Sequence, residues 1–350
     1  MKAIDALYEA HKIAFSPFLF ETVYCMLELK VFDEIADDSE GSSIDSIMDN
    51  TGLPRYGLGV LLEMAEVAEI VTIDADHQVR LTKIGFFLRN DKMVQVNIRF
   101  THNVCFRGLH SLKESIESGN PEGLKSLGDW KTVYEGLSEL PEDIKKSWFE
   151  FDHFYSDNSF EGALAIIFKD SPKQIFDIGG NTGKWAKAST QYNSEVKVKI
   201  FDLPGQIAVA KENIVACHGI SDRVEYQEID LLKQTSEIPA GADVYWMSQF
   251  LDCFSEHEIE SILRKIRKNI QPNARIYIME TFTDNQRFPA AKYSLVATSL
   301  YFTAIANGNS KMYSSSVFKY IVDKAGFDCI QEHQLHQNSF HSILELAPRA

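Results

Sequence analysis

Three aspartates stand directly after short apolar runs in the middle of the chain: Asp177, Asp202 and Asp230. Carboxylates are usually kept on solvated faces, so acids at the ends of three successive predicted strands are difficult to explain by packing. A carboxylate at such a strand end can accept the hydroxyl groups of a ribose. We interpret Asp202 as a ribose acceptor and Asp230 as the acceptor of an adenine amino group, with Leu231 beside the ring. The pattern predicts a site for a nucleotide-bearing cofactor.

The first acid is followed by a glycine-rich turn that opens into a helical pattern at Lys184. Gly179, Gly180 and Gly183 allow the backbone to pass close to a ligand, often with positive φ. Asn181 stands where a third glycine would be expected, and Asn tolerates the left-handed region. The turn is not the dinucleotide fingerprint GxGxxG, because no glycine occupies its last position. A strand-helix turn that binds nothing remains the alternative for this motif taken alone.

These residues need a sheet to position them. Beyond residue 171, apolar runs alternate with helical patterns, which predicts an α/β domain with a doubly wound, Rossmann-like sheet and an antiparallel strand at or near its end. The predicted strands are 175–178, 196–201, 224–229, 242–250, 274–279, 327–332 and 339–346, and the later predicted helices are 258–270 and 314–325.

Residues 1–100 read as a separate, mostly helical domain. Helical spacing over 18–35 and 57–70 and a hairpin over 70–82 are typical of a winged helix, which raises DNA binding as a hypothesis. The segment carries nine Lys/Arg against seventeen Asp/Glu, including Glu63, Glu66 and Glu69 on the helix that would enter the groove. Phosphates would repel such a helix, so we interpret the domain as a dimerisation module.

Composition narrows the functional classes further. A chain of 350 residues is too long for one ordinary hydrophobic core, which suggests two domains or more. Its net charge of −15 disfavours nucleic acid and anionic membranes as partners. No apolar run approaches a membrane span and no signal segment is evident, so we expect a cytoplasmic protein. The five cysteines are scattered, and no spacing suggests a metal site. The aromatic-rich helices of 101–170 are expected to connect the two domains and to contribute to a substrate pocket.

Several stretches together resemble a known family. The turn at 177–183, Phe201-Asp202-Leu203-Pro204 and the segments 32–35, 81–85 and 238–243 are similar to those of S-adenosylmethionine (SAM)-dependent O-methyltransferases acting on small phenolics and polyketides. The family includes plant caffeate-type and bacterial antibiotic-tailoring enzymes, and the resemblance covers nearly the whole chain. It implies SAM as cofactor, a role in secondary metabolism, Leu203 in the ribose-binding strand end, and a homodimer whose N-terminal domains interlock. Ser248 stands where the family has a lysine near the adenine.

The catalytic half departs from the family pattern. The family reads Leu-His-Asp-Trp after its fourth strand, with the His as general base, whereas this chain reads Leu251-Asp252-Cys253-Phe254. Glu280 matches a family glutamate that orients the base, but no acid stands near 311–313, where a second one is expected. An ordinary Asp, with a pKa of ~4, is a poor general base for a phenol, with a pKa of ~10. Burial beside Glu280 would, however, raise the pKa of Asp252.

Asp252 is therefore a candidate base, with helix capping as the alternative role. The resemblance also places a set of residues near the family's substrate pocket and suggests a flat aromatic acceptor: His153, Tyr155, Asn158, Tyr293 and Phe302. O-methylation of a small aromatic hydroxyl without a metal is the main hypothesis. C-methylation of a phenolic ring and a non-catalytic SAM-binding regulator or partner subunit are the alternatives.

Overall fold

The protein is described from a computed structural model that covers residues 1–36, 40–217, 219–335 and 339–349, without the side chains of residues 155–157. The chain divides into two compact units, Met1–Asn103 and Val104–Ala350, which are described separately. Among the described residues, no helix is both long and apolar enough to cross a membrane.

Unit 1 is mainly helical and has its own apolar core, which includes Met26, Phe32, Ile47 and Leu62. The hairpin β2–β3 pairs antiparallel, and β1 adds to it beside β3. The helix predicted over 18–35 ends earlier, at Glu28. The elements are α1 (Ala3–Ala14), α2 (Ser16–Glu28), β1 (Ser42–Ser43), α3 (Ile44–Thr51), α4 (Arg55–Val67), β2 (Val71–Ile73), β3 (Gln78–Leu81), α5 (Lys83–Asn90) and α6 (Lys92–Phe100).

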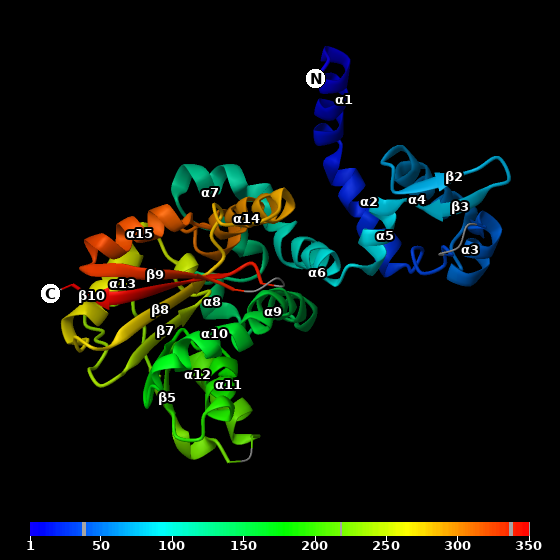
Figure 1. Ribbon diagram of the computed structural model, residues 1–350. Helices are drawn as coiled ribbons and strands as arrows, with labels where there is room; N and C mark the ends of the chain where they lie inside the picture. The colour runs from blue at the N-terminus through cyan, green and yellow to red at the C-terminus, as the bar shows by residue number, and fades with distance from the viewer. Residues whose placement is uncertain (37–39, 218, 336–338, 350) are drawn as a thin grey trace. The chain divides into compact units, whose positions relative to one another are not determined.

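Unit 2 begins with short helices and continues into alternating strands and helices (Figure 1). The first group comprises α7 (Leu112–Ser118), α8 (Val133–Gly136), α9 (Glu142–Ser156) and α10 (Phe160–Ile167). The strands are β4 (Gln174–Ile178), β5 (Lys197–Asp202), β6 (Val224–Glu228), β7 (Val244–Ser248), β8 (Arg275–Glu280), β9 (Phe327–Gln334) and β10 (Ser342–Pro348). The helices among them are α11 (Lys184–Tyr192), α12 (Pro204–Val215), α13 (Glu256–Asn269), α14 (Pro289–Tyr301) and α15 (Ser315–Lys324), and a π-helix, η8 (Phe302–Ala306), follows α14.

The seven strands form one sheet in the order β6-β5-β4-β7-β8-β10-β9. Strands β4 to β8 are parallel, whereas β10 runs antiparallel to both β8 and β9. The predicted α/β class with an antiparallel strand near its end is therefore confirmed. Because the carboxyl ends of parallel strands share one edge, four acids gather there: one near the end of β4, those that end β5 and β8, and the one that follows β6.

Each face of the sheet is covered by its own helices (Figure 1). Helices α13 and α15 pack with one set of strand side chains, including Tyr245 and Met247. Helices α10, α11 and α12 pack with the alternate set, including Trp246. This alternation is the period of two expected for a strand that is buried on both faces. Strand β7 ends at Ser248, short of the predicted limit at 250, because Gln249 adopts φ 46° and leaves the extended region.

Candidate cofactor and acceptor site

The glycine-rich turn after β4 has the tight geometry that its sequence predicts. Gly179, Asn181 and Gly183 have φ values of 76°, 47° and 79°. A Cβ atom at Gly179 would overlap the ring of Phe250, and one at Gly180 would lie 2.7 Å from Asp177 Oδ2. Side chains at these two positions would therefore push the turn away from the sheet edge.

Asp202, the last residue of β5, is tied to this turn. Its Oδ2 accepts the Asn181 backbone N–H at 2.8 Å, and its Oδ1 accepts the Leu203 N–H at 2.7 Å. Burial raises the pKa of Asp202 to about 6, although these two donors favour the charged form. The carboxyl group of Asp177 is also buried, and its Oδ2 has no hydrogen-bond partner among the described residues. Burial, reinforced by the nearby Asp202, raises the pKa of Asp177 well above its usual value.

The next strand ends in a second polar turn. Asp230 follows β6 and uses its Oδ1 to accept the Leu232 N–H at 3.0 Å, while Leu231 is 6% exposed and packs into the core. The Lys265 ammonium group on α13 donates to the carbonyl oxygen atoms of Leu231 and Lys233 at 2.6 and 2.5 Å. Asp202 and Asp230 thus stand at the same edge of the sheet as the glycine-rich turn, and Ser248 ends β7 at this edge on the other side of β4.

A buried pair of acids lies where β7 and β8 end. Glu280 Oε1 accepts the backbone N–H groups of Phe250 and Leu251 at 3.2 and 3.0 Å, whereas its Oε2 has no hydrogen-bond partner among the described residues. The left-handed Gln249 followed by Phe250 in the right-handed region makes a concavity of successive N–H groups, which suits an anion. Asp252 is 5% exposed, and the Cys253 thiol lies 3.5 Å from its Oδ1.

The two acids affect each other's ionisation. Burial raises the pKa of Asp252 to about 6. Burial, followed by the charge of Asp252, raises the pKa of Glu280 well above its usual value. Two buried carboxyl groups whose charges repel each other do not readily ionise together, so we expect the pair to hold one proton near neutral pH. An acid pair in this state can exchange a proton with a ligand.

Aromatic side chains with polar ends stand around this pair. Trp148 Nε1–H donates to the Tyr301 hydroxyl at 2.8 Å, a bond between residues 153 positions apart. The Tyr134 hydroxyl group is buried beside the Cys253 thiol. Burial, and then the neighbouring Cys253, raises the pKa of Tyr134 well above its usual value, so the hydroxyl remains a donor. Trp148 and Tyr134 were noted in the sequence only as members of an aromatic-rich segment, and no local motif marks them.

The predicted pocket residues are dispersed. Phe302 is buried in η8, and its ring lies 5.4 Å from that of Tyr301. His153 stacks on Phe149, and its Nδ1 lies 3.7 Å from Asp152 Oδ2, which in turn lies 3.3 Å from Asn181 Nδ2.

Two further pocket candidates, Tyr293 and Asn158, are exposed in this chain. Tyr293 is 80% exposed on α14, because that helix buries Leu295 and Tyr301 instead. Asn158 is exposed and donates to the Phe154 carbonyl group at 3.2 Å. The side chain of Tyr155 lies outside the described residues. Within the described parts of the chain, no three His, Cys, Asp or Glu residues gather closely enough to hold a metal ion.

Two family models match this chain, one in each unit. Residues 163–328 match the model of an O-methyltransferase domain, and residues 8–78 match that of a Dimerisation2-like domain. The chain is 22% identical over 319 residues to an L-tyrosine C(3)-methyltransferase of Streptomyces lavendulae, which covers 90% of this chain and 85% of that protein.

Two solved structures share the fold. The SAM-dependent methyltransferase SibL in its apo form matches with a TM-score of 0.73 and 21% identity over 98% of this chain and 100% of that one. The O-methyltransferase NcsB1 from neocarzinostatin biosynthesis, solved with SAM and 2-hydroxy-5-methyl naphthoic acid, matches with a TM-score of 0.69 and 19% identity over 94% and 95% of the two chains.

Proposed function

This chain belongs to the SAM-dependent O-methyltransferase family, and we propose that it transfers the methyl group of SAM to a hydroxyl group of a small aromatic acceptor. The observation that carries the proposal is the buried acid pair Asp252–Glu280, which lies at the same sheet edge as the glycine-rich turn. NcsB1, which shares the fold, was solved with an aromatic hydroxy acid, and this supports the acceptor class.

The residues at the sheet edge fit the cofactor. Asp202 would accept the ribose hydroxyl groups, Asp230 the adenine amino group, and Leu231 would pack on the adenine ring. The turn at 179–183 lets the backbone come close to a ligand, since Gly179 and Gly183 have positive φ values and Gly180 carries no Cβ. When bound, SAM supplies an electrophilic methyl group, so the protein must mainly align the acceptor and exclude water.

The acid pair would supply the proton acceptor. A carboxyl group with pKa about 6 is closer to the pKa of a phenol, ~10, than an ordinary Asp is, and proton transfer is favoured accordingly. The ionised carboxyl group of the pair would take the proton from the hydroxyl group of the aromatic substrate. The second carboxyl group, that of Glu280, would hold the proton that the pair shares, and the two backbone N–H groups that donate to its Oε1 fix its orientation.

Two observations favour C-methylation as a second candidate. An aspartate stands at the family's base position, and a relative with 22% identity is named as an L-tyrosine C(3)-methyltransferase. A phenol can attack through its ortho carbon, after which a carboxylate can remove the ring proton. Incubation with ¹³C-methyl SAM and a panel of phenols, followed by NMR of the product, distinguishes a methoxy from an aryl methyl carbon. SAM binding without turnover on any phenol would favour the non-catalytic alternative and contradict the proposal.

Cofactor affinity is expected to rise with pH through about 6. Ribose hydroxyl groups donate to a carboxylate, whereas Asp202, with a pKa of about 6, is neutral below that value. Since the ionised fraction of Asp202 is about one half at pH 6 and about one tenth at pH 5, we expect the Kd of S-adenosylhomocysteine to rise about fivefold from pH 6 to 5 and to level off above 7. Calorimetric titration from pH 5 to 8 measures this, with Asp202→Asn as a variant that should lack this transition. A flat wild-type profile would contradict the assignment.

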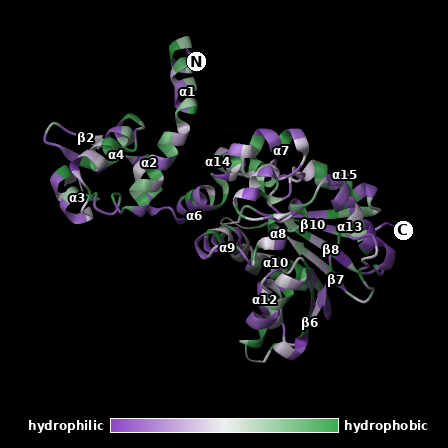
Figure 2. Ribbon diagram, turned by 180° about the vertical axis from the view of Figure 1, so that it is seen from behind, coloured by the Kyte–Doolittle hydropathy of each residue, from purple (hydrophilic) through white to green (hydrophobic). Residues whose placement is uncertain are grey.

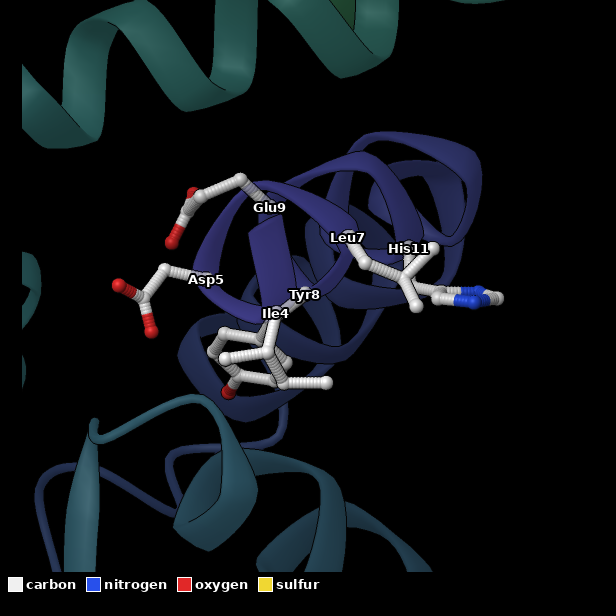
Figure 3. Close-up of a pocket in the computed structure, with 6 residues that line it drawn as sticks. All are labelled: Ile4, Asp5, Leu7, Tyr8, Glu9 and His11. Carbon is white, nitrogen blue, oxygen red and sulfur yellow. The ribbon is translucent and has the colours of Figure 1, made fainter. Parts of the chain in front are cut away.

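We also propose that unit 1 forms a homodimer through α1. No residue of α1 is buried, and Ile4, Leu7 and Tyr8 are 67%, 55% and 54% exposed. Apolar (green) and polar (purple) segments alternate along this helix in Figure 2. An open hollow along α1 is lined by the six residues drawn in Figure 3, where Asp5 and Glu9 point to one side and Leu7 and His11 to another. Exposed apolar patches of this kind mark interaction surfaces.

The double substitution of Ile4 and Leu7 by Glu is expected to convert a dimer into a monomer, because charges would replace the apolar contacts. Light scattering coupled to gel filtration should give about 39.7 kDa for the variant and about twice that for the wild type. Val215→Glu, at a residue 74% exposed at the end of α12, serves as the control and should leave the mass unchanged. A monomeric wild type would rule out this interface.

A further inference from the structure

A buried lysine interrupts the apolar face of α13. Its neighbours Ile262, Leu263 and Ile266 are fully buried in the core, and Lys265 on the same helix is only 8% exposed. A buried ammonium group is costly unless it is hydrogen-bonded, and an apolar residue would be the ordinary choice for packing. The position of Lys265 therefore calls for an explanation beyond the stability of the helix.

The ammonium group of Lys265 forms two hydrogen bonds, and both go to a single turn. Nζ donates to the carbonyl oxygen atoms of Leu231 and Lys233, which lie 34 and 32 residues away in the chain. The donor comes from a rigid, fourteen-residue helix, whereas the acceptors belong to the loop after β6. Lys265 thus fixes a loop backbone to the body of the domain.

The same turn determines the direction of the Asp230 carboxylate. Asp230 Oδ1 accepts the Leu232 N–H at 3.0 Å, and the Asp230 carbonyl oxygen accepts the Ser236 hydroxyl at 2.5 Å. Asp230 is linked electrostatically to Lys265 as well. Burial lowers the pKa of Lys265, and the Asp230 charge opposes this shift. Displacement of the turn would move the carboxylate and the Leu231 side chain together.

We propose that Lys265 is a positioning residue for the adenine subsite, which it forms by holding the turn at 231–233 so that Asp230 and Leu231 face the adenine amino group and ring. This inference rests on the proposed function, because it takes the ligand to be SAM or S-adenosylhomocysteine. Lys265 itself contacts the turn and not the ligand, so its effect is on recognition of the base.

The test compares two ligands that differ only at the purine 6-position: S-adenosylhomocysteine, which has the amino group, and S-inosylhomocysteine, which has an oxo group. In Lys265→Met, calorimetry should show at least a tenfold loss of affinity for the adenosyl ligand and less than a threefold loss for the inosyl ligand. The discrimination between the two ligands should therefore collapse. Turnover at saturating SAM should stay within about twofold of wild type, because the acid pair is untouched.

Controls separate this proposal from the proposed function. Lys268→Met removes an exposed lysine from the same helix and should bind both ligands as the wild type does. Lys265→Gln keeps one amide donor at the buried position and should give an intermediate discrimination, which provides a second test if the Met variant does not fold. Equal losses for both ligands, or unchanged discrimination in both variants, would overturn the positioning role. Failure of the wild type to bind either ligand would instead contradict the proposed function.

Discussion

Asp252→Asn is expected to lower turnover at least a hundredfold while leaving the Kd of SAM within about threefold of the wild type. The amide has nearly the same shape as the carboxyl group but cannot take the proton from the substrate hydroxyl group. General base catalysis typically raises a reaction rate about 10²–10⁴-fold. Single-turnover rates at saturating SAM measure the chemical step, and calorimetry with S-adenosylhomocysteine measures cofactor binding.

The stability of the same variant distinguishes a catalytic role from helix capping. Burial raises the pKa of Asp252 from 3.8 to about 6, so between these values the folded protein holds a proton that the unfolded chain has lost. Wild-type stability therefore falls as pH rises through that window, and an Asn variant escapes the loss. We expect its melting temperature at pH 7 to equal or exceed that of the wild type. Normal turnover, or a clearly lower melting temperature at pH 7, would remove Asp252 from the proposed mechanism.

Asp252→His tests the same site by introducing the histidine that the O-methyltransferase family carries at this position. A base with an ordinary pKa of about 6.5 should sustain O-methylation, and the NMR assay should then detect a methoxy product. If the wild type methylates carbon and this variant methylates oxygen, the residue at position 252 selects the atom that is methylated.

The second large effect is expected at the cofactor end, where Asp202→Ala should weaken SAM binding at least a hundredfold. The substitution removes the proposed ribose acceptor and the acceptor of the Asn181 and Leu203 N–H groups, so the glycine-rich turn also loses its anchor. Hydrogen bonds to charged groups contribute about 1.5–3 kcal/mol each, which is consistent with a loss of this size. Calorimetry with SAM and S-adenosylhomocysteine is the measurement.

Asp243→Ala provides a matched control. Asp243 Oδ2 also accepts two backbone N–H groups, those of Lys173 and Gln174 at 2.8 and 3.0 Å, but it does so where β4 begins, at the opposite edge of the sheet. The control should lose a similar set of bonds without loss of cofactor affinity. Comparable weakening in both variants would mean that Asp202 acts only through the fold.

Local sequence patterns anticipated most of the sheet because they depend on neighbours in the chain. Alternating or continuous apolar runs located the strands to within a few residues, and the glycine-rich turn was recognisable because φ values near 76° at Gly179 and 79° at Gly183 favour glycine. The departures have local causes too, since β7 stops where Gln249 takes a left-handed conformation. The roles assigned to the acids remain predictions.

By itself, then, the sequence determined the class of fold, the family and the chemistry available at the sheet edge, because periodicity and turn residues act over a few positions. The tertiary structure decided which distant groups meet: Trp148 with Tyr301, Lys265 with the turn at 231–233, and the Phe250 and Leu251 N–H groups with Glu280. It also decided the ionisation of Asp252, because burial raises the pKa of this carboxyl group to about 6. Both effects depend on how the sheet edge and its helices enclose each residue, which no local pattern records.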